Sequence, residues 1–406
     1  MSDAVPAVER GVVASGARLP LIDSLRAIAA LLIFAYHALF VTGNLNPGNY
    51  GWYLNAGVPL FYAISGLLLF RPFAAAVIEG RPQPSVLAYA RHRVFRIVPA
   101  YWVALPVVAV VLERTSEVFT PAGIPTYFGF LQIYSLDTFV GGIGQAWTLC
   151  VEVTFYAFLP LWGLLCRWVC AGAAGGARRA HRLLILVGGL AAGSLAWKVA
   201  AVIAVGDNVS AALIPLTVLP AALDQFAVGM VVAVAVAARN AGAGEGPLLR
   251  MAAARPMGLV VAAGVAYWLT GEAHGIGLVS DSPTLGWGGL AITEHELKAV
   301  FAAALLLAAV GADPRRGLVG KALAWQPLSR TGEISYGVYL WHLAILVGFA
   351  GVASMGQQTH WIGGSDGLVP GWAGVGIAFL ITIAVSAASW RLLERRCIDA
   401  SHRVQR

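Results

Sequence analysis

Long runs of apolar residues alternate with short polar segments along nearly the whole chain. A helix needs about 20 mostly apolar residues to cross the hydrocarbon of a bilayer, and somewhat fewer where protein shields it. The pattern therefore predicts an all-α, polytopic membrane protein with ten transmembrane helices. The predicted helices cover residues 20–42, 54–72, 97–113, 146–166, 183–205, 211–238, 256–270, 293–311, 332–351 and 370–393.

One further apolar patch, at residues 122–136, is short and is interrupted near its start by Pro121 and Pro125. Non-helical backbone at membrane depth needs cover from the rest of the protein. We interpret this patch as a re-entrant or interfacial segment. Counting it as a crossing would also place every later loop on the opposite side of the membrane.

The basic residues support this count of helices. With the N-terminus inside, the inner segments hold 23 of the 27 Lys and Arg residues, and only Arg114 falls outside. Arg26, Lys198 and Lys298 lie within predicted helices. Cytoplasmic loops carry such an excess of positive charge, so both termini are predicted to be cytoplasmic. The outer segments hold acidic residues, namely Glu113, Glu117, Asp137, Asp207, Asp281 and Asp366.

The composition excludes several other classes of protein. Of the 406 residues, 59% are hydrophobic and 12% are charged. Soluble enzymes and disordered chains both have fewer hydrophobic and more charged residues than this. Four cysteines make no disulfide framework, and no metal site is predicted. The net charge of +7 reflects loop arginines, so we predict a lipid bilayer and no nucleic acid as partner. One membrane domain, 20–396, lies between cytoplasmic tails at 1–19 and 397–406.

The first predicted helix carries Asp23, Arg26 and His37. Ionisable groups inside a membrane are costly and usually mark function. Arg26 and His37 are about three turns apart, so they project from one face roughly 16 Å apart along the axis. Asp23 is one turn before Arg26, within reach of an ion pair. A purely structural interpretation has Arg26 snorkelling to the surface and His37 packed in the core, but their alignment favours function.

Glu152 enters the fourth predicted helix from the outside, after Trp147. This places its carboxylate at the depth predicted for His37. A carboxylate next to a histidine makes a general-base pair, because it fixes the tautomer and stabilises the imidazolium. The alternative is a glutamate that only stabilises the start of its helix through the macrodipole.

Arg93 and Arg96 precede the third predicted helix and share a face if the helix has already begun there. Two guanidinium groups at the cytoplasmic surface suit phosphate oxygens. Arginines are also common in any inner loop, whatever its function. The pair alone does not decide between these two interpretations.

Other polar residues lie inside the predicted helices. His342 falls near the middle of the ninth, with Tyr339 on the same stripe, an arrangement that packing alone also produces. Asp224 in the sixth is deep enough to pair with a buried cation or to accept from a hydroxyl. Ser65 and Gly66 in the second allow a neighbouring helix to approach closely.

These stretches, in this order, resemble the bacterial acyltransferase-3 family of integral membrane O-acyltransferases. The first helix has the family's Arg-x10-His arrangement in Arg26 and His37. Further matches are the runs FYAISG at 61–66, RVFRIVP at 93–99, WTLCVE at 147–152, SYGVYLWH at 335–342 and ERR at 394–396. Thr148 and Val153 stand where the family often has serine and a second acid. Thr148 keeps the hydroxyl, and Glu152 remains as the carboxylate of its run.

The resemblance implies transfer of an acyl group, commonly acetyl from acetyl-CoA, from the cytoplasm to a hydroxyl on the outer side. Arg93 and Arg96 would hold the CoA phosphates, and Arg26 would stand between donor and acceptor. His37, oriented by Glu152, would act as general base, or would itself carry the acyl group. The implied acceptor is a sugar, a glycolipid or a secondary metabolite. The implied location is the bacterial cytoplasmic membrane.

Two other classes of function fit the intramembrane charges. A transporter or lipid flippase would use Arg26, His37, Glu152 and Asp224 as a substrate or proton path. A regulatory membrane protein without chemistry would tolerate an apolar residue in place of His37. Dependence on an acyl-CoA separates the enzyme from both.

Overall fold

The computed structural model describes residue 19 and residues 21–45, 50–206, 208–275, 286–350 and 371–403. This part of the chain is helical and contains no strand. Residues 1–18 of the predicted N-terminal tail lie outside the described residues, as do the acidic Asp207, Asp281 and Asp366. The all-α architecture predicted from the sequence is confirmed for the described residues.

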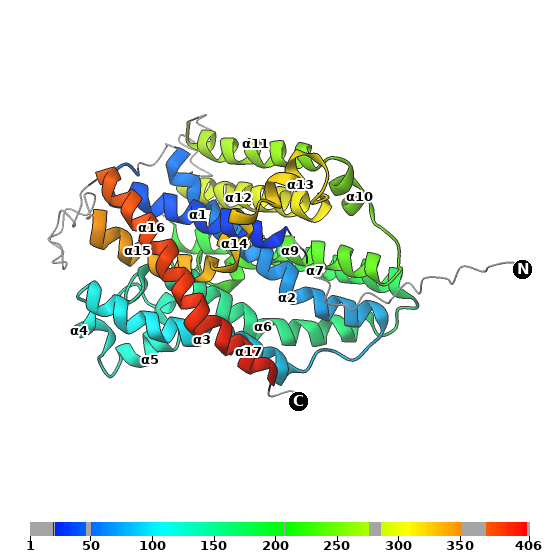
Figure 1. Ribbon diagram of the computed structural model, residues 1–406. Helices are drawn as coiled ribbons and strands as arrows, with labels where there is room; N and C mark the ends of the chain where they lie inside the picture. Colours follow the sequence, from blue (N-terminus) through cyan, green and yellow to red (C-terminus); the bar gives the residue numbers. More distant parts are fainter. Residues whose placement is uncertain are drawn as a thin grey trace, which may run out of the picture.

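Each of the ten predicted apolar segments corresponds to one long helix of the described chain (Figure 1). These helices are α1 (Ile22–Val41), α2 (Gly57–Glu79), α3 (Val86–Val111), α6 (Trp147–Cys170), α7 (Gly176–Val205), α9 (Leu219–Asn240), α11 (Pro256–Gly275), α12 (Gly286–Gly311), α15 (Ser335–Ala350) and α16 (Gly371–Ser389). Shorter helices connect them or extend their ends, and the ones that matter here are η1 (Tyr50–Ala56), α10 (Pro247–Ala254), α13 (Gly317–Leu323), α14 (Gln326–Glu333) and α17 (Arg395–Arg403).

Within the described residues, seven helical segments are long and apolar enough to cross a bilayer. The pair α10 and α11, bent by 94° at their junction, makes an eighth if counted as one span. Of the remaining long helices, α12 carries Glu294, Glu296 and Lys298 in its first half, and α15 has only 16 residues. The architecture is that of a multi-pass membrane protein, while the count of ten crossings and the side of the termini stay predictions.

The second and third helices extend further than hydropathy predicts. α2 continues to Glu79, and α3 begins at Val86, where the Ser85 hydroxyl accepts from the Ala88 amide at 3.4 Å. Arginine is a good helix former, and its long side chain can keep the charged head in water. The polar run containing Arg93 and Arg96 is therefore helical, and the two arginines lie one turn apart on α3.

Residues 122–136 form only short helices and turns. The longest helix here is α5 (Gly123–Phe128), which is about 9 Å long at 1.5 Å per residue, far less than the roughly 30 Å hydrocarbon core. The segment packs on α3, where Tyr101 donates to the Tyr127 carbonyl at 2.9 Å and Trp102 donates to the Phe128 carbonyl at 3.1 Å. A segment of this form does not cross as a helix and has the protein cover that its irregular backbone needs.

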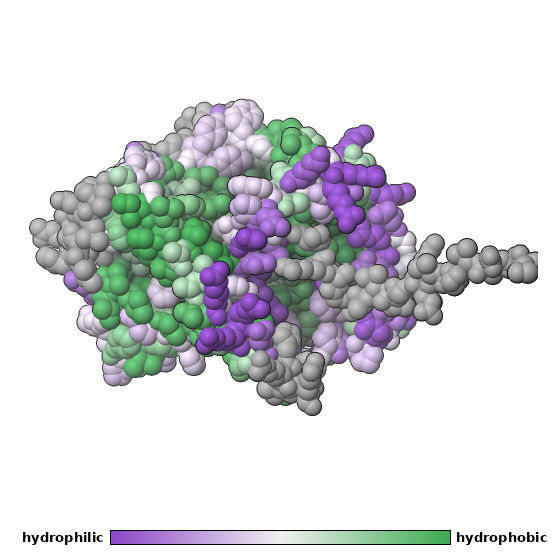
Figure 2. Space-filling model, viewed as in Figure 1, coloured by the Kyte–Doolittle hydropathy of each residue, from purple (hydrophilic) through white to green (hydrophobic). Residues whose placement is uncertain are grey.

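Polar and apolar side chains separate on the surface. Figure 2 shows hydrophilic side chains gathered where α10, α13, α14 and α17 lie in Figure 1, the side predicted to face the cytoplasm. Arg250, Lys321 and Arg396 of these elements are exposed. Large apolar side chains are exposed elsewhere, for example Leu161 and Ile203, as expected of helices that face lipid.

Two glycines let α2 and α9 pack in close contact. A Cβ on Gly66 would lie 2.1 Å from the Phe226 carbonyl oxygen, and one on Gly229 would lie 1.8 Å from the Ala63 carbonyl oxygen. No hydrophobic force drives helices together in lipid. Small residues let the backbones approach closely, so that van der Waals packing holds the two helices together. The close approach expected at Ser65-Gly66 is confirmed, and it places Ser65 and Phe226 at the centre of the bundle.

We expect Gly229→Ala to destabilise the protein by about 1–3 kcal/mol, the usual cost of overpacking a tight interface. The Ala63 carbonyl is helix backbone and cannot move aside cheaply. Gly188→Ala in α7 is the matched control, since nothing lies within 4 Å of its added Cβ. Thermal unfolding of both variants in detergent measures the difference, and equal melting temperatures would contradict the packing argument.

Candidate active site

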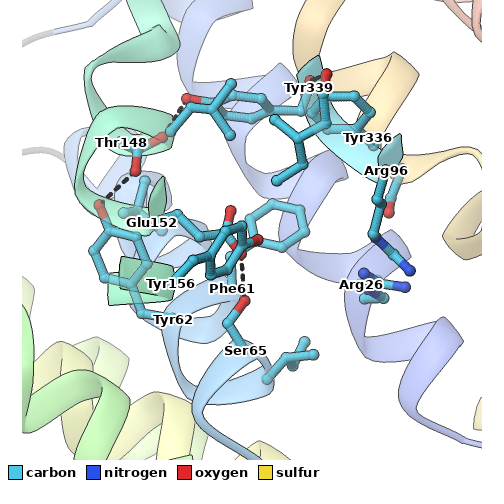
Figure 3. Close-up of a pocket in the computed structure, with 15 residues that line it drawn as sticks. Arg26, Phe61, Tyr62, Ser65, Arg96, Thr148, Glu152, Tyr156, Tyr336 and Tyr339 are labelled. Carbon is cyan, nitrogen blue, oxygen red and sulfur yellow. Dashed lines mark hydrogen bonds between the residues drawn. The ribbon is translucent and has the colours of Figure 1, made fainter. Parts of the chain in front are cut away.

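A cavity of about 70 Å³ lies between α1, α2, α3, α6 and α15. Its polar lining comes from side chains that are far apart in sequence, including Arg26, Ser65, Arg96, Glu152, Tyr156 and Tyr339. Figure 3 shows Arg26 and Arg96 next to each other on one side of this cavity, with Glu152 and Tyr156 projecting into its centre. Five of the residues singled out in the sequence, Arg26, Ser65, Arg96, Glu152 and Tyr339, therefore share one space.

The charged groups of this cavity are two guanidinium groups and one carboxylate. Ser65 donates its hydroxyl to Glu152, and the Asp23 carboxylate lies 3.9 Å from the Arg26 guanidinium. The ion pair expected between Asp23 and Arg26 is confirmed. Arg93 lies one turn before Arg96, and its Nε is buried without a hydrogen-bond partner in the described structure. A small anionic or carbonyl group fits this arrangement of donors.

The opposite wall joins α6 to α15 through Tyr339. The phenol of Tyr339 donates to the Gln145 carbonyl and therefore accepts from the Thr148 hydroxyl. The Gln145 side chain in turn donates to the carbonyls of Tyr339 and Leu340, both at 3.1 Å. The hydrogen bond of Thr148 thus uses the hydroxyl group, which a serine at this position would also provide. Buried hydrogen bonds from both helices hold this wall together.

Two histidines meet directly beyond Tyr339. Nε2 of His342 lies 2.9 Å from Nδ1 of His37, and the two ring centroids are 4.9 Å apart. The Tyr339 ring lies 6.0 Å from the His342 ring, and Tyr339 also lines the cavity, so the pair is next to the cavity wall. His342 is 1% exposed. α1 and α15 place these residues together although 305 positions separate them in sequence.

Backbone carbonyls fix the proton positions of this pair. Nδ1 of His342 lies 2.8 Å from the Tyr339 carbonyl and 3.0 Å from the Val338 carbonyl. A carbonyl only accepts, so Nδ1 of His342 carries the proton, and Nε2 of the neutral ring accepts. His37 must then donate through its own Nδ1, which is also 3.0 Å from the Ile33 carbonyl. Nε2 of His37 is left with a free lone pair, the form that a general base needs.

The structure therefore changes the expected partner of His37. Glu152 accepts from Ser65 inside the cavity, and His342 orients the His37 ring instead. The hydropathy pattern gives the depth of each residue but not which helices are neighbours, and this is why the two candidates could not be paired correctly from the sequence. His342 lies against His37, and Tyr339 lines the cavity.

Two other candidates lie outside this cavity. Trp147 lines a second cavity on the far side of Tyr62. Asp224 is buried, lies 2.6 Å from the Lys198 ammonium and accepts from the Ser194 hydroxyl at 3.2 Å. It thus has both contacts that the sequence left open for it, a buried cation and a hydroxyl. Both residues belong to one region on the predicted outer side, here called the outer region, which the hydropathy pattern does not reveal.

That outer region centres on a charged run in α12. His295 and Glu296 of this run contact Asp224 and Lys198 respectively, and Lys298 pairs with Glu294. The signal for these contacts was visible in the sequence, since EHELK at 294–298 is unusually charged for a membrane helix.

Comparison with known proteins identifies the family of this chain. The sequence matches the Acyltransferase domain family, Acyl_transf_3, over residues 19–391. The chain belongs to the acyltransferase-3 family. A relative from Rhizobium leguminosarum bv. viciae, described as Nodulation protein 10, is 25% identical over 398 residues, which is 92% of this chain and 91% of that protein. No solved structure matches the chain significantly.

Membership of the acyltransferase-3 family confirms the resemblance found in the sequence motifs. Those motifs contribute Arg26, Arg96, Glu152 and Tyr339 to the cavity and His342 to the histidine pair. The described residues hold no cluster of three or more His, Cys, Asp or Glu that could bind a metal ion. The geometry of this acyltransferase-3 protein offers a histidine pair near a cavity lined by two arginines.

Proposed function

We propose that the protein moves a short acyl group, with acetyl as the first candidate, from acyl-CoA at the cytoplasmic side to a hydroxyl on the outer side. The observation that carries this proposal is the pair of His37 and His342, one aromatic contact from a cavity that contains Arg26 and Arg96. The acceptor class is a glycan, a glycolipid or a similar hydroxyl compound.

The inner arginines supply the donor site. Arg93 and Arg96 are one turn apart on α3, and together they suit the phosphates of CoA. The cavity volume of about 70 Å³ is far below the several hundred Å³ of pockets for drug-sized ligands. We infer that the nucleotide stays outside while the thioester end enters. This size is the reason for preferring a short acyl group.

The histidine pair supplies the base. In the direct route, Nε2 of His37 takes the proton of the acceptor hydroxyl as its oxygen bonds to the thioester carbonyl carbon. The carbon–sulfur bond then breaks, and the CoA sulfur leaves and receives the proton from His37. Arg26 stabilises the negative charge that develops on the carbonyl oxygen. His342 accepts from Nδ1 of His37 throughout and stabilises the imidazolium.

A second route uses the same atoms in two steps. Nε2 of His37 attacks the thioester carbonyl carbon, the carbon–sulfur bond breaks, and CoA leaves as the thiolate. The acceptor hydroxyl oxygen then bonds to the acyl carbon, the carbon–nitrogen bond to His37 breaks, and the hydroxyl proton passes through Nε2 of His37 to the CoA sulfur. The two routes differ in whether labelled acyl groups accumulate on the protein when no acceptor is present. Rapid acid quenching of the purified enzyme with acetyl-labelled acetyl-CoA distinguishes them.

The test uses inside-out membrane vesicles supplied with acetyl-CoA labelled in the acetyl group. We expect label to enter the lipid or glycan fraction, and Arg96→Gln to raise the KM for acetyl-CoA roughly ten- to a hundredfold, the loss of one or two charge-assisted hydrogen bonds. Arg250→Gln is the matched control, because Arg250 is exposed and does not line the cavity. Absence of label with acetyl-CoA and with longer acyl-CoAs would overturn the proposal.

A further inference from the structure

A second, larger cavity of about 230 Å³ lies between α2, α6, α9 and α12. Its polar lining consists of Asn55, Thr217, Gln225, Glu294, His295 and Lys298, with Trp147 at one side. Each of these residues lies in the first half of α6, α9 or α12, or in the segment directly before α2 or α9. The four helices are predicted to enter the membrane from the same, outer side, so the cavity belongs to the outer half of the protein.

This cavity shares a wall with the cavity of the arginines. Val58 and Tyr62 line both, and the consecutive residues Trp147 and Thr148 line one cavity each. Tyr62 is held in the wall by its stacking on Phe226, with ring centroids 4.5 Å apart, and it donates to the Thr148 carbonyl at 3.3 Å. A group bound in the outer cavity is therefore one side chain away from the proposed thioester.

The short helix η1 connects the outer cavity to the histidine pair. Asn55 at its end lines the cavity, and Trp52 of the same helix contacts Tyr36 with ring centroids 6.4 Å apart. Tyr36 immediately precedes His37 and contacts its ring at 5.2 Å between centroids. The general base and the outer cavity thus flank the same seven-residue helix.

The lining offers both kinds of hydrogen-bonding group without a net charge. Glu294 pairs with Lys298, and His295 lies 3.4 Å from Asp224 behind the wall. Oδ1 of Asn55 is buried and has no hydrogen-bond partner in the described structure. A buried acceptor without a partner costs free energy, and a ligand hydroxyl would satisfy it. Hydroxyls both donate and accept, which matches a lining of amides, carboxylate, ammonium and imidazole.

We propose that this outer cavity binds the acceptor as a neutral sugar unit with free hydroxyls, an assignment that rests on the acyl transfer proposed above. Positive and negative groups balance in the lining, so a phosphorylated or otherwise ionic ligand would meet a group of its own charge sign wherever it bound. This disfavours an ionic ligand. Trp147 provides an apolar surface for the carbon face of the ring. Asn55 and Glu294 hold the hydroxyls, and the acylated one faces the shared wall.

The test measures thermal stabilisation of the purified protein in lipid nanodiscs. The probes are the methyl glycosides of glucose, galactose and N-acetylglucosamine, with glucose 6-phosphate as the anionic comparison and acetyl-CoA as the donor. We expect at least one methyl glycoside to raise the melting temperature of the wild type. Asn55→Leu and Glu294→Gln should weaken the apparent affinity for it at least about tenfold, the loss of one well-placed hydrogen bond.

Stabilisation by acetyl-CoA shows that each variant is folded. Glu272→Gln is the matched control, because Glu272 accepts from Tyr50 at 2.7 Å outside the cavity lining. The inference is overturned if no methyl glycoside stabilises the wild type, if stabilisation survives in both cavity variants, or if glucose 6-phosphate binds better. Failure of acyl transfer itself gives a different result, namely stabilisation by a glycoside without stabilisation by any acyl-CoA.

Discussion

Replacing His37 with alanine is expected to lower the rate of acyl transfer roughly 10²- to 10⁴-fold, the usual contribution of a general base. The KM for acetyl-CoA should stay within about twofold, because the side chain acts on the acceptor proton and not on the donor phosphates. Label transfer in vesicles measures both quantities. His181→Ala is the matched control, since His181 is exposed near the start of α7.

His342 should show the behaviour of a positioning residue. In His342→Gln, the side-chain oxygen can still accept from Nδ1 of His37, so part of the activity should remain. In His342→Leu that acceptor is gone, and the lone pair on Nε2 of His37 is no longer fixed by a partner ring. We expect kcat to fall in the order wild type, glutamine, leucine, with KM values unchanged. Equal loss in the two variants would indicate a packing role only.

The sequence predicted the helical segments well because each is encoded locally. All ten apolar runs correspond to helices, and the segment at 122–136 has the short, proline-interrupted form that was expected. The predicted C-terminal end of α2 and the predicted start of α3 were wrong by several residues. Hydropathy predicts that a helix ends where charged residues begin. The real helix continues as long as its backbone hydrogen bonds continue, and Arg93 and Arg96 are therefore helical.

The candidate site was only partly predictable, since it depends on which helices pack together. Arg26, Arg96 and Glu152 were recognised separately, as costly charges or as motif residues, and the fold brings them to one cavity. The pairing of His37 with His342 joins α1 to α15 and could not be derived from periodicity within either helix. Lys198 was counted only as a charge inside a span, although its position suggested a buried partner.

Replacing Lys198 with methionine is expected to destabilise the protein by about 3–5 kcal/mol, the cost of leaving a buried charge without its partner. Lys198 is 1% exposed and Asp224 is 6% exposed. The Lys198 ammonium is 2.6 Å from Asp224 and also contacts Glu296, so it joins α7, α9 and α12. Without it, two carboxylates face each other in the bundle. The amount of folded protein after heating, measured by size-exclusion chromatography, should fall sharply.

A double variant separates charge from packing. In Lys198→Met with Asp224→Asn, one buried carboxylate is neutralised, so we expect more than half of the lost stability to return. Lys321→Met, which changes an exposed lysine on the predicted cytoplasmic side, serves as the control and should change little. If the double variant is as unstable as the sum of the two single variants, the ion pair between Lys198 and Asp224 does not account for the lost stability. Because Asp224 of this network contacts His295, which lines the outer cavity, the same ion pairs support the wall of the cavity proposed for the acceptor.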